Sequence, residues 1–293
     1  MTKPAVALIG AGSAGTAMAV ALHREGYPIA AVSSRSVESA QRCGSLVDCE
    51  HTGTDPTDAS RQAEIIIIST PDNAIETTCQ TMADSGGFRN GQLVLHLSGA
   101  LTSDALNAAR AAGADTLSLH PAQTMVEPLR GADLLKKAWF CLEGNDSAVT
   151  RGRDIANDLS GNTIVIDKDK KALYHAALSF SSNYLTTVEA IAIEMLTETG
   201  ISRQNALALI MPLIQGSVDT LANCGLPDAL TGPVSRGDAK TIEKHLCAMR
   251  QGPESHLQIY KMLGLEALKL ARAKGKMAQG REEMIQNLLI NNT

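Results

Sequence analysis

The chain has 293 residues, a length that suggests about two domains. Hydrophobic residues make up 44% and charged residues 19%, which is ordinary for a globular protein with a large buried core. The net charge of −5 excludes a basic field that would steer the chain toward DNA or RNA. The aromatic content of 3% likewise excludes a stacking platform for single strands, so no nucleic-acid partner is expected.

The six cysteines are scattered singly and form no C-x-x-C pair. This pattern predicts neither a zinc site nor a redox motif, so no metal is expected. Single cysteines also suit a reducing cytosol. The apolar start runs straight into a glycine motif, unlike a signal peptide, and no apolar run approaches the roughly 20 residues of a membrane span. We therefore expect a cytoplasmic protein without a membrane partner.

Short apolar runs alternate with segments of helical periodicity through the first 167 residues. Strands are expected at 5–10, 29–33, 64–69, 93–97, 116–119, 139–143 and 163–167, and helices at 14–25, 74–82, 103–112 and 147–159. The run EIIIIS at 64–69 is continuously apolar, as in a strand that is buried on both faces. Strands that alternate with helices predict an α/β domain with a doubly wound, mostly parallel sheet. Ligands of such sheets bind at the carboxyl ends of the strands.

The pattern becomes purely helical after Asp167. Helices are expected at 170–200, 202–223, 239–250, 253–273 and 281–291, with a loop at 225–238. Pro212 should interrupt and kink the second of these helices. We therefore expect two domains, an α/β domain at 1–167 and an all-helical domain at 168–293. The 170–200 helix is apolar on several sides, which favours a homodimer through the helical domain.

The motif G-x-G-x-x-G lies between the first expected strand and the first expected helix, the context in which it binds a dinucleotide. Gly10 permits the tight turn, Gly12 allows the backbone to approach a pyrophosphate, and Gly15 lets helix and strand pack closely. The N–H groups at the start of the helix then face the phosphates. We therefore expect the α/β domain at 1–167 to be a dinucleotide-binding Rossmann domain with this phosphate loop: Gly10, Ala11, Gly12, Ser13, Ala14 and Gly15. The alternative is a glycine turn in an unrelated α/β protein.

The end of the second strand distinguishes the two nicotinamide cofactors. NAD-specific folds place Asp or Glu about 20 residues after the glycines, to bind the ribose hydroxyls. Here the strand ends without an acid, and hydroxyls and a guanidinium stand in its place: Ser33, Ser34, Arg35 and Ser36. Such groups suit a 2′-phosphate and favour NADP (NADPH). The alternative is an arginine that is merely solvated in a surface turn.

Polar residues follow three further strands at the edge where a doubly wound sheet places its chemistry. Thr70 and Pro71 close the third long strand and are predicted to contact the cofactor, whereas Asp72 is interpreted as a helix N-cap. Ser98, a candidate catalytic residue, and Gly99, a candidate substrate contact, follow the next strand. His120 precedes a proline at the end of another strand, so either a catalytic or a structural role is open.

Lys171, His175 and Asn183 lie along one side of the first C-terminal helix, because residues four apart share a helix face. Reduction of a carbonyl needs a proton for the developing alkoxide, and a lysine in a cleft can supply a proton or a positive charge. His175 could orient Lys171, relay its proton or donate itself. On spacing alone, Lys171 could equally belong to the solvated run DKDKK. We leave Lys168 and Lys170 as surface charges.

The order of the motifs GAGSAG, TPD, HLSG, LHPAQ, KALYHAA…SNYL and ALTGPVSRGD covers nearly the whole chain. Together they resemble a family of Rossmann-like oxidoreductases whose C-terminal helical domain is named only as a domain of unknown function. That family is similar to pyrroline-5-carboxylate reductase, ketopantoate reductase and the β-hydroxyacid dehydrogenases. The resemblance implies an NADP-dependent reductase of a small oxo or imino acid, with ketopantoate reductase-like chemistry. The alternative is a sensor or scaffold that binds NADP without turnover.

The resemblance also assigns residues. In the β-hydroxyacid dehydrogenases a catalytic lysine is followed four residues later by asparagine, and here Lys171 is followed by His175. In pyrroline-5-carboxylate reductase a loop rich in Ser, Thr and Gly holds the substrate carboxylate. The segment LTGPVSRGD resembles it and implies substrate contacts from Thr231, Gly232 and Arg236. The helical domain at 168–293 is therefore expected to bind the substrate as well as to form the dimer. Arg236 could grip a carboxylate or pair with Asp238.

Overall fold

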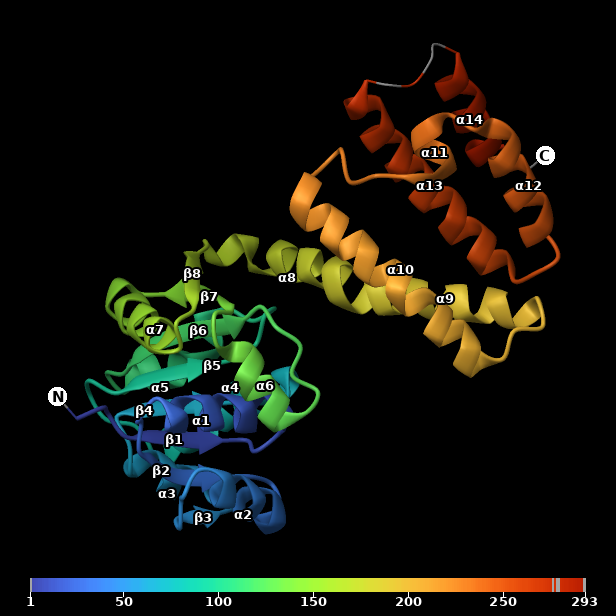
Figure 1. Cartoon of the computed structure of the whole chain (residues 1–293). Helices are drawn as coiled ribbons and strands as arrows, with labels where there is room; N and C mark the ends of the chain where they lie inside the picture. Colours follow the sequence, from blue (N-terminus) through green and yellow to red (C-terminus); the bar gives the residue numbers. More distant parts are fainter. Residues whose placement is uncertain (1, 276, 278–279, 292–293) are drawn as a thin grey trace. The chain divides into compact units, whose positions relative to one another are not determined.

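The computed structural model of the chain, shown in Figure 1, describes residues 2–275, 277 and 280–291. The chain divides into two compact units, one ending at Tyr184 and the other starting at Leu185. The predicted boundary after residue 167, which separates cofactor binding from substrate binding, stays a prediction. The first compact unit extends past that boundary and includes residues 168–184.

The first unit is built on a sheet that, within the described residues, has eight strands in the order β3-β2-β1-β4-β5-β6-β7-β8. All neighbouring strands are parallel except β6 and β7, which confirms the prediction of a mostly parallel, doubly wound sheet. The strands are β1 (Val6–Ile9), β2 (Ile29–Ser33), β3 (Thr52–Gly53), β4 (Ile65–Ile68), β5 (Leu93–His96), β6 (Asp115–Pro121), β7 (Trp139–Gly144) and β8 (Asn162–Val165).

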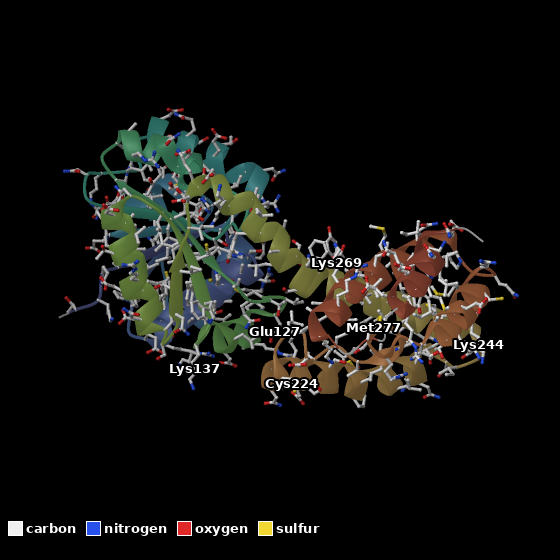
Figure 2. The ribbon with its side chains drawn as sticks, turned by 90° about the horizontal axis from the view of Figure 1, so that it is seen from above. Glu127, Lys137, Cys224, Lys244, Lys269 and Met277 are labelled. Carbon is white, nitrogen blue, oxygen red and sulfur yellow. The ribbon has the colours of Figure 1, made fainter. Side chains whose placement is uncertain are left out.

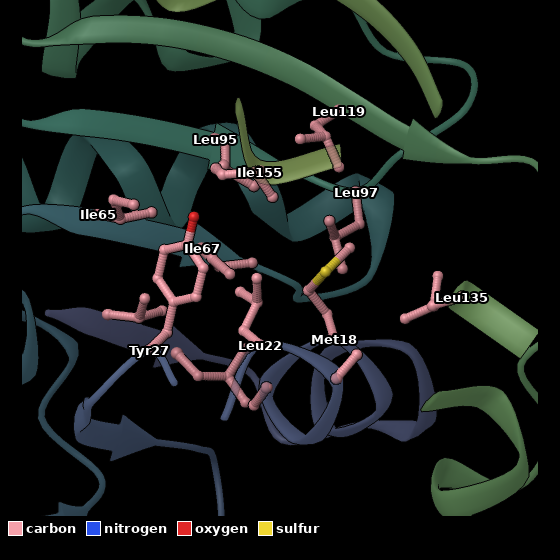
Figure 3. Close-up of a cluster of buried hydrophobic side chains, with 14 of the residues drawn as sticks. Met18, Leu22, Tyr27, Ile65, Ile67, Leu95, Leu97, Leu119, Leu135 and Ile155 are labelled. Carbon is pink, nitrogen blue, oxygen red and sulfur yellow. The ribbon is translucent and has the colours of Figure 1, made fainter. Parts of the chain in front are cut away.

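Helices cover both faces of this sheet (Figure 1). One face packs against α1 (Ser13–Arg24), α2 (Val37–Leu46), α6 (Pro128–Leu135) and α7 (Asp146–Asp158). The other face packs against α3 (Pro56–Arg61), α4 (Asp72–Asp84) and α5 (Asn107–Ala111). Figure 3 shows part of the first core, in which Met18 and Leu22 of α1 point toward the sheet.

Strand β4 shows why its sequence is continuously apolar. Ile65 and Ile67 belong to the core on one face of the sheet, and Ile66 and Ile68 to the core on the other. Successive side chains of a strand point to opposite faces, so a strand covered by helices on both sides needs an apolar residue at every position. The predicted central strand is confirmed.

Several short elements escaped the sequence prediction: α2, β3, α3 and α6, all in the first unit. Each is short, and the helices among them are held by local caps rather than by a long apolar stripe. The Asp55 carboxylate accepts hydrogen bonds from Thr57 N and Asp58 N at the start of α3. The Glu127 carboxylate, labelled in Figure 2, caps α6 in the same way. The helix expected at 103–112 is a 3₁₀ turn, η1 (Ser103–Leu106), followed by α5.

The single helix expected at 170–200 is divided. A 3₁₀ turn, η2 (Lys168–Lys170), leads into α8 (Lys171–Ser179), which a π-helical turn at Phe180–Tyr184 joins to α9 (Leu185–Glu198). Serine hydroxyls donate to carbonyls four residues back at this point, from Ser179 to His175 and from Ser181 to Ala177. Such bonds compete with the regular ladder and disturb helices. Gly200, with φ of +92°, follows the end of α9.

The second unit is helical throughout its described residues, which confirms the predicted helical C-terminal region. The helices after α9 are α10 (Arg203–Cys224), α11 (Gly232–Arg236), α12 (Ala239–Met249), α13 (Glu254–Lys274) and α14 (Arg281–Ile290). Helix α11 lies within the segment expected to be a loop. Helices α9 and α10 pack through Ile193, Ala206 and Ile210. Helices α11 to α14 form a separate core.

Helix α10 is continuous through Pro212, where an interruption was expected. The Ser202 hydroxyl caps it by accepting from Asn205 N at 3.3 Å. Among the described helices it alone is long and apolar enough to cross a membrane, with a mean hydropathy of 1.2 in its best window. A single helix of this kind is weak evidence for a span. Only 6% of that window is buried, so α10 presents an apolar surface that the rest of the unit does not cover.

Candidate cofactor cleft and catalytic cluster

Two glycines of the phosphate loop are required by the protein itself. Gly10 has φ of +101°, and a Cβ atom there would lie 2.6 Å from the Ser69 carbonyl oxygen. A Cβ atom at Gly15 would lie 2.4 Å from the carbonyl oxygen of Gly10. These separations are far below van der Waals contact, and backbone atoms cannot move aside cheaply. The glycines therefore allow β1, β4 and α1 to meet at this turn.

Gly12 is different, because no described atom lies within 4 Å of a Cβ atom built there. Its φ of −79° is open to any residue. Gly12 precedes α1, whose first turn has no side-chain cap and no acidic residue among the described residues. The unpaired N–H groups and the positive end of the helix dipole are thus available to an anion. Nothing in the described protein requires a glycine at this position, whereas a phosphate that approaches the backbone would.

A cleft of about 1000 Å³ extends from this loop along the carboxyl ends of the strands. All the residues predicted to contact the cofactor line it except Gly15, which packs beneath the loop: Gly10, Ala11, Gly12, Ser13, Ala14, Ser33, Ser34, Arg35, Ser36, Thr70 and Pro71. The volume is in the range that suits a large ligand. The Thr70 hydroxyl oxygen is buried without a hydrogen-bond partner in the described structure, so a ligand could satisfy it.

One end of the cleft is rich in hydroxyl and guanidinium groups. The Ser36 hydroxyl caps α2 by accepting from Ser39 N at 3.2 Å, and it donates to the Ser39 hydroxyl at 2.9 Å. Arg42 also donates to the Ser39 hydroxyl, at 2.9 Å. Arg35 is exposed and lines the cleft. Ser39 and Arg42 were missed by the sequence prediction, although their spacing of three on α2 places them on one helix face.

Two turns that follow β4 and β5 are joined by Ser98, which also lines the cleft. The Ser98 hydroxyl donates to the Asp72 carboxylate at 2.7 Å and accepts from Ala100 N and Leu101 N. All the strong hydrogen-bonding capacity of this hydroxyl is therefore used within the protein. The interpretation of Asp72 as an N-cap is wrong, because Pro71 occupies the cap position and the carboxylate instead holds Ser98.

Gly99, next to Ser98, is packed against two histidines. A Cβ atom at Gly99 would lie 2.5 Å from Cδ2 of His175 and 2.8 Å from Nε2 of His120. The two imidazole rings meet edge to face, with centroids 5.8 Å apart. The fold thus brings β5, β6 and α8 together at one point beside the cleft. Only a glycine leaves room for both rings, so the role of Gly99 in the described structure is to admit them.

His120 is held on its other side by a residue that the sequence prediction missed. Nδ1 of His120 lies 3.0 Å from the Tyr174 hydroxyl, and the two rings are edge to face at 5.7 Å. Burial, reinforced by Lys171 and His175, lowers the pKa of His120 to about 3. The imidazole is therefore neutral at physiological pH. Tyr174 stands three residues after Lys171, and this spacing was the available signal.

Lys171 begins α8, and its side chain is fully buried. Its Nζ atom has no hydrogen-bond partner within the described residues. Burial lowers the pKa of Lys171, an effect that Cys141 and Glu143 oppose. The possibility that Lys171 belongs to a solvated run is thus excluded. Lys168 and Lys170 are exposed, as expected, and pair with Asp104 and Asp169.

The remaining predicted residues are farther along the chain. Asn183 is exposed and lies in the π-helical turn at Phe180–Tyr184, which interrupts the regular helix expected from the sequence. Thr231 and Gly232 begin α11, and Arg236 ends it, all in the second unit. The Asp238 carboxylate caps α12 through Thr241. These residues stay predictions as substrate contacts.

Two family matches account for most of the chain. Residues 2–121 match a Rossmann-like domain, and residues 138–267 match a family described as a domain of unknown function, DUF2520. The predicted family resemblance is therefore confirmed. No curated protein matches the chain.

Solved structures of oxidoreductases are similar to this chain over 92% or more of its length. A candidate NADP oxidoreductase from Bacteroides fragilis is 25% identical, with a TM-score of 0.75, over 92% of this chain and 99% of that one. An imine reductase from Myxococcus stipitatus in complex with NADP⁺ is 21% identical, with a TM-score of 0.62, over 98% and 100%. A pyrroline-5-carboxylate reductase from Coxiella burnetii is 17% identical, with a TM-score of 0.60, over 95% and 100%. The latter two share the fold.

Proposed function

We propose that this chain, which joins a Rossmann-like domain to a DUF2520 domain, is an NADP-dependent oxidoreductase that reduces the C=O or C=N bond of a small oxo or imino acid. The observation that carries the proposal is Lys171, a fully buried amine that has no hydrogen-bond partner among the described residues. It lies near His120 and His175, which pack against Gly99 next to the cofactor cleft. A buried polar group without a partner costs stability, so its presence argues for a use.

The cofactor proposal rests on four features of the cleft. They are the open space at Gly12, the uncapped start of α1, the unpartnered Thr70 hydroxyl, and the hydroxyl and guanidinium groups near α2: Arg35, Ser36, Ser39 and Arg42. The first three suit a dinucleotide phosphate and the fourth suits a 2′-phosphate. When bound, NADPH supplies a hydride to the substrate carbon. That the similar imine reductase is named as an NADP⁺ complex supports the same choice.

The protein's own residues would orient the reacting group and stabilise the negative charge that develops on it. Lys171 would supply the proton or the positive charge that stabilises the negative oxygen. His175, one helical turn away, would orient the lysine or the substrate. Ser98 would act indirectly, because its hydroxyl fixes Asp72 and the turn before Gly99. Asn183 and Gly99 would contact the polar groups of the substrate, and so would the second unit's Thr231, Gly232 and Arg236.

The decisive experiment is a screen for NADPH oxidation by the full chain. The panel contains ketopantoate, pyrroline-5-carboxylate and related oxo and imino acids, because relatives by fold or resemblance act on such compounds. We expect one class of substrate to be consumed with equimolar NADPH. The competing function is an NADP-binding sensor without turnover. Tight NADPH binding with no consumption by any member of the panel would favour the sensor.

Cofactor selectivity gives a first quantitative test. We expect NADPH to bind at least roughly tenfold more tightly than NADH, because charge-assisted contacts to the 2′-phosphate are strong. Arg35→Asp should narrow or invert this ratio in fluorescence titrations. Arg153→Asp, the same change at an exposed position on α7, is the matched control and should leave the ratio unchanged. Equal affinities for the two cofactors in the unmodified chain would contradict the assignment.

The proposal includes a homodimer formed through the helical domain. Large apolar side chains of α10 are exposed over its whole length, among them Leu209, Met211, Leu213 and Leu221. Such a surface marks a protein interface, and a two-fold dimer is the commonest closed assembly. We expect a dimer by light scattering at micromolar concentration. Leu213→Glu should shift it toward monomer while circular dichroism stays helical; a monomeric unmodified chain would contradict the prediction.

A cytoplasmic location completes the proposal. All six cysteines are free thiols, and four of them are buried. Free thiols are the usual state in reducing compartments, where disulfides are rare.

A further inference from the structure

We propose that Tyr174 is a positioning residue, which holds His120 in the tautomer whose Nε2 carries the proton, so that a neutral imidazole donates a hydrogen bond to the substrate oxygen. The inference rests on the proposed function, and it assigns to Tyr174 a task that the sequence motifs did not suggest. It also separates two tasks: His120 stabilises the developing negative oxygen, and Lys171 supplies the positive charge or the proton.

The geometry around His120 fixes both ends of its ring. Nδ1 lies 3.0 Å from the Tyr174 hydroxyl, a contact that joins β6 to α8. Nε2 lies on the side of Gly99, where a Cβ atom would be 2.8 Å away. Gly99 follows Ser98, which lines the cofactor cleft. Nδ1 is therefore the nitrogen held by the Tyr174 hydroxyl, and Nε2 is the nitrogen on the side of Gly99, next to the cleft residue Ser98.

The charged and titratable groups around the ring keep it neutral. Lys171 and His175 on α8 and His96 on β5 all disfavour a second proton on His120, and burial acts in the same direction. A neutral imidazole has one donor nitrogen and one acceptor nitrogen. Which nitrogen donates is set by the partner of the other nitrogen. Tyr174 is that partner.

The phenol can act on Nδ1 in only one favourable way. Burial and the neighbouring Cys141 raise the pKa of Tyr174, so the hydroxyl keeps its proton. If Tyr174 donates to Nδ1, both groups are satisfied and Nε2 carries the proton. If Nδ1 instead donated to Tyr174, the phenolic proton would be left with Cys141, whose sulfur is a weak acceptor. The first arrangement is favoured, and it places the N–H group of His120 on the side of Gly99, next to the cleft residue Ser98.

A fixed N–H group of this kind has a defined chemical use. As hydride adds to the carbonyl carbon, the π electron pair of the C=O bond moves to the oxygen, and a donor already aimed at that oxygen stabilises the charge without reorganisation. No proton leaves His120 in this step. The alkoxide takes its proton from Lys171 or from solvent. A neutral donor also avoids placing a second cation next to Lys171 in a buried site.

Nitrogen NMR of the full chain tests the tautomer directly and needs no substrate. Histidine is labelled with ¹⁵N, and the loss of one signal pair in His120→Asn assigns His120 among the seven histidines. We expect the Nε2–H tautomer in the unmodified chain. Tyr174→Phe, which removes only the hydroxyl, should produce a mixture of tautomers or the Nδ1–H form. An Nδ1–H tautomer in the unmodified chain, or an unchanged tautomer in Tyr174→Phe, would overturn the inference.

The chain contains a matched control in a second histidine–tyrosine pair. Nδ1 of His245 lies 2.9 Å from the Tyr260 hydroxyl, with the rings edge to face at 5.9 Å, in the helical unit. Tyr260→Phe should leave the His120 signals unchanged. Once a substrate is identified, Tyr174→Phe should lower kcat by roughly tenfold to a hundredfold, less than the loss of an oxyanion donor, with unchanged NADPH affinity. If no substrate is found, the proposed function is contradicted. The NMR experiment still tests the tautomer of His120, because it needs no substrate.

Discussion

Lys171→Ala should preserve folding and NADPH affinity while lowering turnover by roughly 10²–10⁴, the usual contribution of general acid catalysis. The physical reason is that Lys171 is fully buried and has no hydrogen-bond partner among the described residues. Its Nζ atom lies over the Tyr174 ring, 5.8 Å from the centroid, and its hydrogen-bonding capacity is left for a substrate. Turnover is measured by NADPH consumption with the substrate from the screen, and affinity by titration. Lys170→Ala is the matched control, because its side chain is exposed and adjacent in sequence. It should retain full activity.

A second substitution at the same position separates a structural lysine from a catalytic one. Lys171→Met replaces the amine by an apolar chain of similar length, so the cost of burying an amine without a partner disappears. We expect the free energy of unfolding to rise while turnover falls as in Lys171→Ala. Functional sites commonly sacrifice stability for activity in this way. Burial lowers the pKa of Lys171. Burying this side chain therefore costs the most free energy at a pH where the amine is charged in both the folded and the unfolded state. The gain in the free energy of unfolding from Lys171→Met should therefore shrink as the pH rises toward 10.5, the ordinary pKa of lysine. A stable, fully active Lys171→Met variant would contradict the catalytic role.

The fold could be predicted from the sequence wherever burial dictates every position of a segment. β4 needs four isoleucines because cores lie on both of its sides, and the glycine motif is explained by backbone contacts around Gly10 and Gly15. Short elements gave no such signal. α3 and α6 depend on the caps Asp55 and Glu127, which look like ordinary surface acids in a sequence.

The sequence was enough to predict which residues belong to the candidate site, but not which of them contact one another. Lys171, His120 and Gly99 stood at the right places relative to expected strands and helices. Their burial and mutual packing depend on how α8 lies against β6 and β7, which no local pattern reveals. Tyr174 was missed for this reason, because its partner His120 is 54 residues away. The π-helical turn was missed because it depends on serine hydroxyls that bond backwards within the helix.

The phosphate loop allows a prediction in which two neighbouring glycines behave oppositely. Gly15→Ala places a Cβ atom 2.4 Å from the Gly10 carbonyl oxygen, and neither backbone segment can move aside without disturbing the turn. We expect a loss of about 1–3 kcal/mol in the free energy of unfolding, as for other overpacked sites. NADPH binding should weaken with it, because the loop itself is displaced.

Gly12→Ala should instead leave the free energy of unfolding within about 1 kcal/mol of the unmodified chain, because the position precedes α1 and tolerates a side chain. Its methyl group would occupy the space that a pyrophosphate needs close to the backbone. We therefore expect NADPH affinity to fall by at least tenfold, on the order of 1.4 kcal/mol or more. Urea unfolding and NADPH fluorescence titration of both variants measure the two effects separately. Unchanged NADPH affinity in a stable Gly12→Ala variant would show that the phosphates do not pass over this loop, and the cofactor would then have to bind elsewhere in the cleft.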